Sequence, residues 1–180
     1  MNAFLDDPRV NLYGFEAGGH GIESGEHAVR LTPGAADLGL FQGAESYLLE
    51  NSEGQTKHAY SSSAGLGYAS VGPEHAWLKD IGRVQYSYAT DDEAMSAFKD
   101  LCETEGIIPA IESSHAVAGS YKAAADLKAK GYTNPVIVVN ISGRGDKDVA
   151  TAGKWFGYLT DEQSKALEAN GAHGTSVDGE

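Results

Sequence analysis

The sequence predicts an α/β fold in which helices flank a parallel sheet. Three runs of β-branched and aromatic residues have the character of strands, at residues 10–15, 84–89 and 136–141. Two helical segments separate the second run from the third, and strands that alternate with helices are typical of crossovers between parallel strands. The third run is apolar almost throughout, as in strands buried on both faces. We therefore expect a three-layer α/β arrangement with the sheet in the middle.

The region between the first two strands is expected to be an irregular excursion. Residues 31–63 are rich in glycine and polar side chains, with a turn near Glu53 and Gly54. A short hairpin fits within this stretch. The sequence contains no internal repeat.

Two helices are predicted between the second and third strands. Thr90 is the N-cap of the first, with Glu93 three residues later in a capping-box pattern, and Gly106 ends it. The second helix runs from about Glu112 to Gly131. Both have apolar residues at helical spacing, which predicts that each covers the sheet with one face.

The end of the chain has a different composition from the rest. From Glu168 onward glycine, alanine and charged residues dominate, which is typical of a frayed terminus. We expect one domain over residues 1–160 and a tail over residues 161–180.

Composition excludes several classes of protein. The chain has 180 residues, 41% of them hydrophobic, and a net charge of −13, which argues against nucleic acid and anionic membranes as partners. The N-terminus lacks the pattern of a signal peptide. The single cysteine, Cys102, fits a reducing cytoplasm and is expected in a helix core. No CxxC or HExxH spacing supports a zinc site.

The segment after residues 136–141 is the strongest candidate for chemistry. It contains Ser142, Gly143 and the triplet Arg144-Gly145-Asp146. Ligands of open α/β sheets bind just beyond the carboxyl ends of the strands. A surface turn with solvated charges is the alternative, and the triplet alone would also suit an adhesion motif.

Three further segments have similar character. The first is a glycine-rich loop at residues 16–27, whose histidines we interpret as structural. The second is a small-residue loop at residues 63–75, expected to be buried against a partner. In the third, Glu112 begins a helix after an apolar approach. It is either a structural cap favoured by the helix dipole or a partly desolvated carboxylate with a catalytic role.

These segments together resemble a known family. The motifs EAGGHGIESGEHA, SAGLGYASVGPEHAWLKDIGR, TDDEA, EGIIPAIESSHA and VVNISGRGDKD are similar, in order and spacing, to the C-terminal half of the tryptophan synthase β subunit. The resemblance covers residues 4–156 and implies part of a fold-type-II enzyme that uses pyridoxal 5′-phosphate. The implied reaction is a carbon–oxygen lyase type of β-replacement, in which indole replaces the hydroxyl of L-serine to give L-tryptophan.

The resemblance also assigns roles to residues. Ser142, beside Gly143, matches the serine whose hydroxyl bonds the pyridine nitrogen of the cofactor. Glu112 matches a catalytic carboxylate next to its phenolic oxygen, and Gly65 lies in the loop along the ring edge. Tyr68 and Ser70 match positions whose backbone carbonyls hold a monovalent cation, sodium or potassium.

Two departures from the family accompany these matches. Gly67 stands where the family has an aspartate that helps close the site. The family's Schiff-base lysine and phosphate loop precede the region that matches Met1, which implies an internal start or a truncated or split gene. The implied partners are the N-terminal half or a full β chain, the α subunit and a second copy of the chain. The alternative is a non-catalytic remnant that serves only in binding or assembly.

Overall fold

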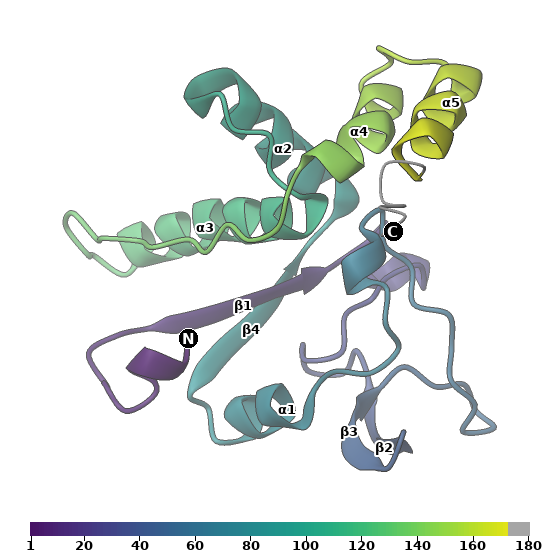
Figure 1. Cartoon of the computed structure of the whole chain (residues 1–180). Coiled ribbons are helices and arrows are strands. Elements are labelled where there is room, and N and C mark those ends of the chain that lie inside the picture. The colour runs from purple at the N-terminus through teal and green to yellow at the C-terminus, as the bar shows by residue number, and fades with distance from the viewer. Residues whose placement is uncertain (173–180) are drawn as a thin grey trace, which may run out of the picture.

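A computed structural model describes residues 1–172 (Figure 1). The strands are β1 (Leu12–Ala17), β2 (Asp37–Phe41), β3 (Ala44–Leu48) and β4 (Val84–Ala89). The α-helices are α1 (Pro73–Asp80), α2 (Asp91–Glu105), α3 (Ile111–Ala129), α4 (Val149–Trp155) and α5 (Asp161–Ala172). Short 3-10 turns lie at Asn2–Phe4, Ile22–Ser24, Ala64–Leu66 and Asp146–Asp148.

The centre of the fold is a parallel pair of strands, β1 and β4, with Leu12 opposite Val84 and Ala17 opposite Ala89. Helices α2 and α3 lie on one side of this pair and α1 on the other (Figure 1). The predicted α/β class is therefore confirmed, with parallel strands between helices. The first strand begins two residues later than predicted, and the second has the predicted bounds.

Helix α2 begins and ends as its sequence predicts. The Thr90 hydroxyl accepts a hydrogen bond from the Glu93 amide at 3.3 Å, and the Glu93 carboxylate accepts one from the Thr90 amide at 2.8 Å. Gly106 ends the helix in the left-handed conformation. Both features satisfy backbone groups that a bare helix end leaves unpaired.

Helix α3 packs unusually close to β1 because one of its residues has no side chain. A Cβ atom built on Gly119 would lie only 2.2 Å from the ring of Phe15. The helix therefore sits directly on the strand, and this fixes the start of α3 beside the carboxyl end of the sheet.

The predicted third strand is wrong. Residues 136–141 form an extended segment beside α3 that makes no ladder (Figure 1). Val136 and Val138 are each 91% exposed, while Val139 packs against the cluster that includes Ala89 and Val117. A strand requires a neighbour to satisfy its backbone, and in the described part of the chain none lies along this segment. The apolar pattern of residues 136–141 is real, but a pattern alone does not provide the neighbouring strand that a sheet needs.

The predicted hairpin is present as β2 and β3, which pair in antiparallel fashion. Its turn residues, Gln42 and Gly43, both have positive φ, as required by the two-residue turns that match strand twist. The turn predicted near Gly54 is also present, where the Gly54 amide donates to Asn51.

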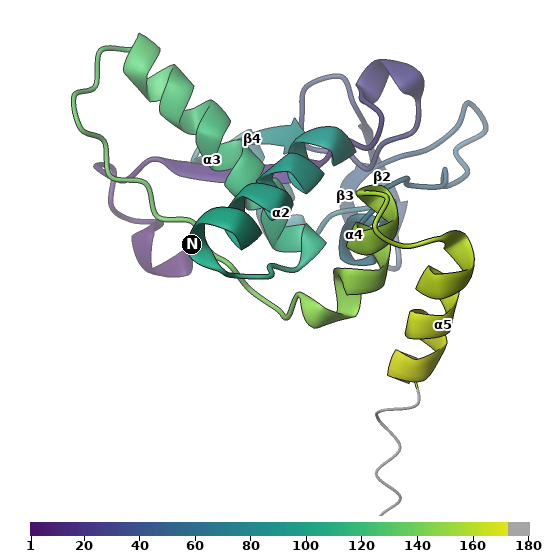
Figure 2. The same cartoon turned by 90° about the horizontal axis from the view of Figure 1, so that it is seen from above.

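The C-terminal region is helical through Ala172, so the proposed tail includes α5 rather than only irregular chain. Figure 2 shows α5 projecting from the body of the molecule beyond α4, its main contact. The rest of the predicted tail, residues 173–180, lies outside the described residues. Within residues 1–172, no helix combines the length and apolarity needed to cross a membrane.

Candidate active site

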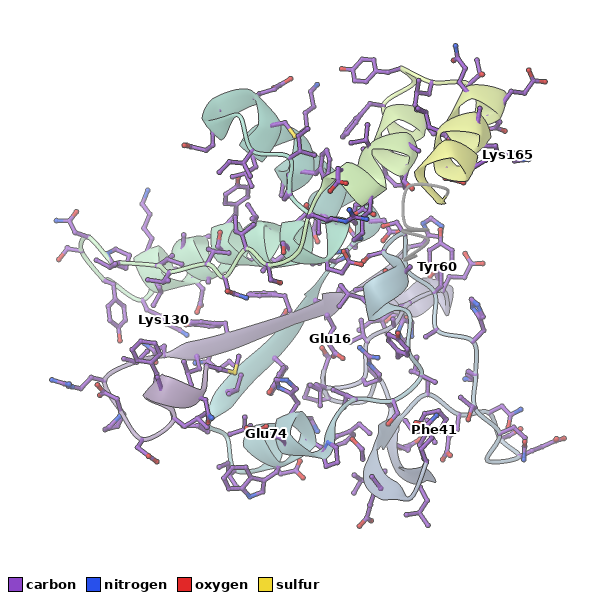
Figure 3. All side chains as sticks on the ribbon, viewed as in Figure 1. Glu16, Phe41, Tyr60, Glu74, Lys130 and Lys165 are labelled. Atoms are coloured by element: carbon purple, nitrogen blue, oxygen red, sulfur yellow. The ribbon has the colours of Figure 1, made fainter. Side chains whose placement is uncertain are left out.

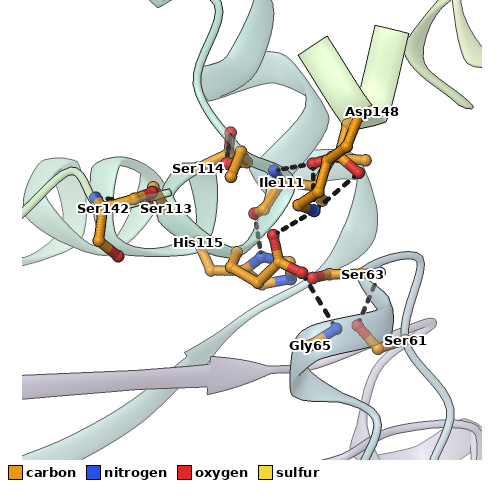
Figure 4. Close-up of polar contacts among 12 residues, drawn as sticks. Ser61, Ser63, Gly65, Ile111, Ser113, Ser114, His115, Ser142 and Asp148 are labelled. Carbon is orange, nitrogen blue, oxygen red and sulfur yellow. Dashed lines mark hydrogen bonds and ion pairs between the residues drawn. The ribbon is translucent and has the colours of Figure 1, made fainter. Parts of the chain in front are cut away.

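The candidate site lies where the carboxyl ends of β1 and β4 face the start of α3. Loop residues 61–72 and 142–148 meet there (Figure 4). Glu16 marks the end of β1 beneath this region (Figure 3). The location agrees with the general position of ligand sites in parallel sheets.

Glu112 connects three segments of the chain (Figure 4). One carboxylate oxygen, Oε1, accepts a hydrogen bond from the Gly65 amide at 3.0 Å. The other accepts one from Lys147 Nζ at 2.9 Å. Lys147 also binds Asp148, whose carboxylate in turn accepts a bond from the Ile111 amide at 2.9 Å. Asp148 thus satisfies the first amide of α3, and Glu112 is free to face the loop at Gly65.

The electrostatic surroundings keep Glu112 ionised. Partial burial raises the pKa of its carboxyl, but hydrogen bonds from Lys147 and from backbone amides outweigh burial and lower the pKa to about 2. The same contacts raise the pKa of Lys147, against the effect of its own desolvation. Near neutral pH Glu112 is therefore a fixed hydrogen-bond acceptor with a negative charge.

Replacement of Glu112 by Gln removes this ion pair and should therefore lower the free energy of unfolding in a pH-dependent way. A carboxyl whose folded pKa lies below its unfolded value stabilises the fold above the unfolded value, and this contribution is lost as pH falls through the folded pKa. We expect Glu112→Gln to lower the free energy of unfolding by about 1 to 3 kcal/mol at pH 7. The difference should shrink below pH 4.5 and vanish near pH 2.

Urea unfolding at several pH values measures this effect. Glu105→Gln, which neutralises an exposed carboxylate at the end of α2, is the control and should change stability little at any pH. A Glu112→Gln penalty that stays constant between pH 7 and pH 3 would show that the ion pair does not set the pKa.

A side chain at Gly65 would displace the carboxylate of Glu112. A Cβ atom there would lie 2.6 Å from Glu112 Oε1, closer than real Cβ contacts allow. The absence of a side chain lets the Gly65 amide reach the carboxylate. This direct bond holds Gly65 beside Glu112.

Ser142 and Gly143 lie in a loop that contacts the same first turn of α3 through Ser113. Ser113, the neighbour of Glu112, donates from its hydroxyl to the Ser142 carbonyl at 2.7 Å and accepts from the Ser142 amide at 3.0 Å. These bonds hold the backbone of Ser142, and its side chain is exposed. Gly143 has a φ of 77° and passes close to Ala110. Adjacent residues of α3 therefore hold the two predicted parts of the site.

Sequence reasoning missed a set of buried polar groups behind Glu112. Two atoms, Asp91 Oδ2 and His115 Nε2, are buried without a hydrogen-bond partner within residues 1–172, and the buried Ser63 hydroxyl helps to lower the pKa of Glu112. Burial lowers the pKa of His115, so its ring is neutral, and its Nδ1 bonds the Ile111 carbonyl at 2.8 Å. Unsatisfied buried polar groups are costly and uncommon. Asp91 and His115 therefore keep unused hydrogen-bonding capacity close to the start of α3.

The carbonyls of Tyr68 and Ser70, which the resemblance assigns to a monovalent cation, both face one side chain. Both accept hydrogen bonds from Arg30 Nη1, the second at 3.1 Å. Gly67, which precedes Tyr68, has a negative φ of −80°, and a Cβ atom there would meet only atoms at 3.6 Å or more. Within residues 1–172, no group of three or more His, Cys, Asp or Glu side chains could hold a metal ion.

Comparison with known proteins identifies the family. No protein-family model matches the chain. A tryptophan synthase beta chain of Mycobacterium tuberculosis (strain ATCC 25618 / H37Rv) is 59% identical over 159 residues, or 88% of this chain. That of Mycobacterium leprae is 58% identical over the same length, and that of Streptomyces coelicolor is 49% identical over 172 residues, or 96% of the chain. The chain belongs to the tryptophan synthase beta chain family.

The chain spans little more than a third of the length of these tryptophan synthase beta chains, 36% of the Mycobacterium tuberculosis protein and 39% of the Streptomyces coelicolor protein. The resemblance predicted from the five motifs is thus confirmed, together with its partial extent. Overall identity does not by itself assign roles to single residues of the site.

Proposed function

We propose that this chain forms one side of the cofactor site of a tryptophan synthase beta type enzyme. The observation that carries the proposal is the start of α3, where Glu112 faces Gly65 and Ser113 faces Ser142. One helix turn thereby presents a carboxylate and a serine loop to the same region. This arrangement suits a flat, polar ligand that is contacted along its edge.

The residues present fit pyridoxal 5′-phosphate. The unsatisfied polar atoms of Asp91 and His115 support this fit, because a polar ligand could use them. Ser142 would hold the ring nitrogen and Gly143 would allow close approach, with Gly65 and Glu112 along the ring. When bound, this cofactor supplies an electron sink for exchange of the β-substituent of an amino acid.

The chain's own residues then have distinct tasks. A neutral serine hydroxyl at Ser142 orients the ring by a hydrogen bond and does not donate a full charge to it. Glu112, ionised through Lys147 and Gly65, is a preorganised acceptor that holds a proton-bearing group in place. The partly apolar approach through Ile111 limits water beside the carboxylate.

We also propose the substrates and partners of the complete protein. They are L-serine and indole as substrates, an α subunit, the remaining part of a β chain, and a second copy of the chain, in the cytoplasm. The similarity to tryptophan synthase beta chains supports this assignment.

A chimera tests the proposed function. The chain replaces the 159 matched residues of the Mycobacterium tuberculosis protein, and tryptophan formation from serine and indole is measured with the cofactor present. We expect an active chimera. A folded chimera that binds the cofactor but forms no tryptophan would favour the alternative of a non-catalytic binding or assembly module.

Within that chimera, Ser142→Ala should weaken cofactor binding by about tenfold to a hundredfold, the loss of one buried polar partner. Ser142→Asp should instead protonate the ring nitrogen through a charge-assisted bond and shift the ratio of products away from β-replacement. Ser120→Ala, whose hydroxyl bonds the Val117 carbonyl within α3, is the control. Unchanged affinity, absorbance spectrum and product ratio in both Ser142 variants would remove Ser142 from the cofactor.

A further inference from the structure

A buried ion pair lies directly beneath the candidate site. Glu16 and Arg30 are each only 6% exposed. Glu16 Oε1 accepts a hydrogen bond from Arg30 Nε at 3.0 Å, and Glu16 Oε2 accepts the backbone amides of Arg30 and Leu31 at 3.0 and 2.7 Å. The carboxylate of Glu16, which Figure 3 labels, therefore fixes both the side chain and the backbone of Arg30.

The other hydrogen bonds that the Arg30 guanidinium donates, within the described residues, all go to one loop. Nη1 donates to the Tyr68 and Ser70 carbonyls. The carbonyl between them, that of Ala69, accepts the Leu49 amide at 2.9 Å. Three consecutive carbonyls of the loop are thus each occupied by a donor, and two of those bonds come from a single cation.

Two carbonyls that converge on one positive charge are the usual surroundings of a bound cation. Here the positive charge belongs to the protein. A guanidinium keeps its charge at all accessible pH values, and its fixed fork of donors matches two acceptors at once. A sodium or potassium ion would need the same oxygens and would sit against this charge, so Tyr68 and Ser70 do not fit a metal ion.

We propose that Arg30 is a built-in cation that fixes the loop of residues 63–72 in place of a monovalent metal ion. The loop matters because its turn at Ala64–Leu66 carries the Gly65 amide that binds Glu112. Arg30 is therefore a positioning residue, which acts on the site through the loop. The inference rests on the hydrogen bonds of this chain and holds whether or not the proposed catalytic function is correct.

Thermal unfolding of the full chain in different salts tests the proposal. Sodium, potassium, caesium and tetramethylammonium chloride are compared at equal ionic strength. We expect the unfolding temperatures of the unmodified chain to agree within about 1 °C, because an ion that does not bind the folded state cannot stabilise it. Sodium-23 relaxation should likewise show no bound sodium that potassium displaces.

The variants Arg30→Met and Glu16→Gln/Arg30→Met remove the internal cation, and the second also removes the carboxylate that the first leaves unpaired. We expect both to unfold at least about 5 °C lower in tetramethylammonium chloride. Sodium or potassium should then restore part of the loss in a saturable way, a readout that a purely structural arginine would not produce. Arg9→Met, which removes an exposed guanidinium paired with Asp7, is the control and should show neither effect.

Two results would overturn the proposal. One is saturable stabilisation of the unmodified chain by sodium or potassium, which is decisive even when the variants fail to fold. The other is a folded double variant whose unfolding temperature is the same in every salt. Neither measurement involves catalysis, so each outcome is independent of the chimera described above.

Discussion

Gly145→Ala is expected to destabilise the chain by about 3 kcal/mol or more. A Cβ atom on Gly145 would lie 2.1 Å from the Ile108 carbonyl oxygen and 2.5 Å from that of Pro109. Both obstacles are backbone atoms in the segment that leads into α3, so they cannot rotate away as a side chain would. The loop of residues 142–148 would have to leave its place, and with it the Lys147 and Asp148 contacts that hold Glu112 and the first amide of α3.

Urea or thermal unfolding measures the effect, and the pKa of Glu112 reports the displaced loop. Gly72→Ala is a matched control because Gly72 has a φ of −59° and nothing within 4 Å of a Cβ atom. It should be neutral or slightly stabilising, since alanine restricts the unfolded chain. A Gly145→Ala chain with unchanged stability would mean that the loop does not pack on residues 108–110.

The exposed segment at residues 136–141 is expected to make the chain self-associate. Val136 and Val138 are almost fully exposed, and within residues 1–172 the extended segment forms no strand ladder. Such a segment is a template for strand addition by another chain, and the net charge of −13 opposes it only weakly over short distances. The double variant Val136→Lys/Val138→Lys should weaken self-association by about tenfold or more, because the charges face outward and oppose pairing.

Sedimentation velocity over a range of concentrations measures this. Leu40→Lys on the hairpin is the control, since Leu40 is 80% exposed yet already lies in a paired strand, and it should leave self-association unchanged. A chain that remains a compact monomer at high concentration would contradict the prediction and would mean that the exposed segment is harmless.

The elements that the sequence predicted well depend on nearby residues. Thr90, Glu93 and Gly106 set the ends of α2 through bonds that span a few residues, so their spacing is sufficient. Residues 136–141 show the opposite case. Their apolar pattern reports a tendency to be buried, whereas a strand depends on a neighbour elsewhere, and no local pattern contains that information.

The candidate site likewise contains residues that sequence motifs predict and residues whose role depends on the packed structure. Glu112, Gly65 and Ser142 were recognised from motifs, and the structure brings the first two into direct contact. Asp91 and His115 were not recognised, because their buried atoms without partners are defined only by the packed structure. The role of Arg30 could not be predicted from the sequence, since its bonds to Tyr68 and Ser70 join residues far apart in the chain.

The pairing of β1 with β4 affects the order in which the chain folds during synthesis. Leu12 finds its partner only at Val84, so β1 leaves the ribosome several seconds before β4 at the usual rate of about 5 to 20 residues per second. Helices α2 and α3, in contrast, are consecutive and form by local contacts. Pairing of β1 with β4 is therefore expected late in folding. Chaperones that shield unpaired strands would act on β1 during that interval.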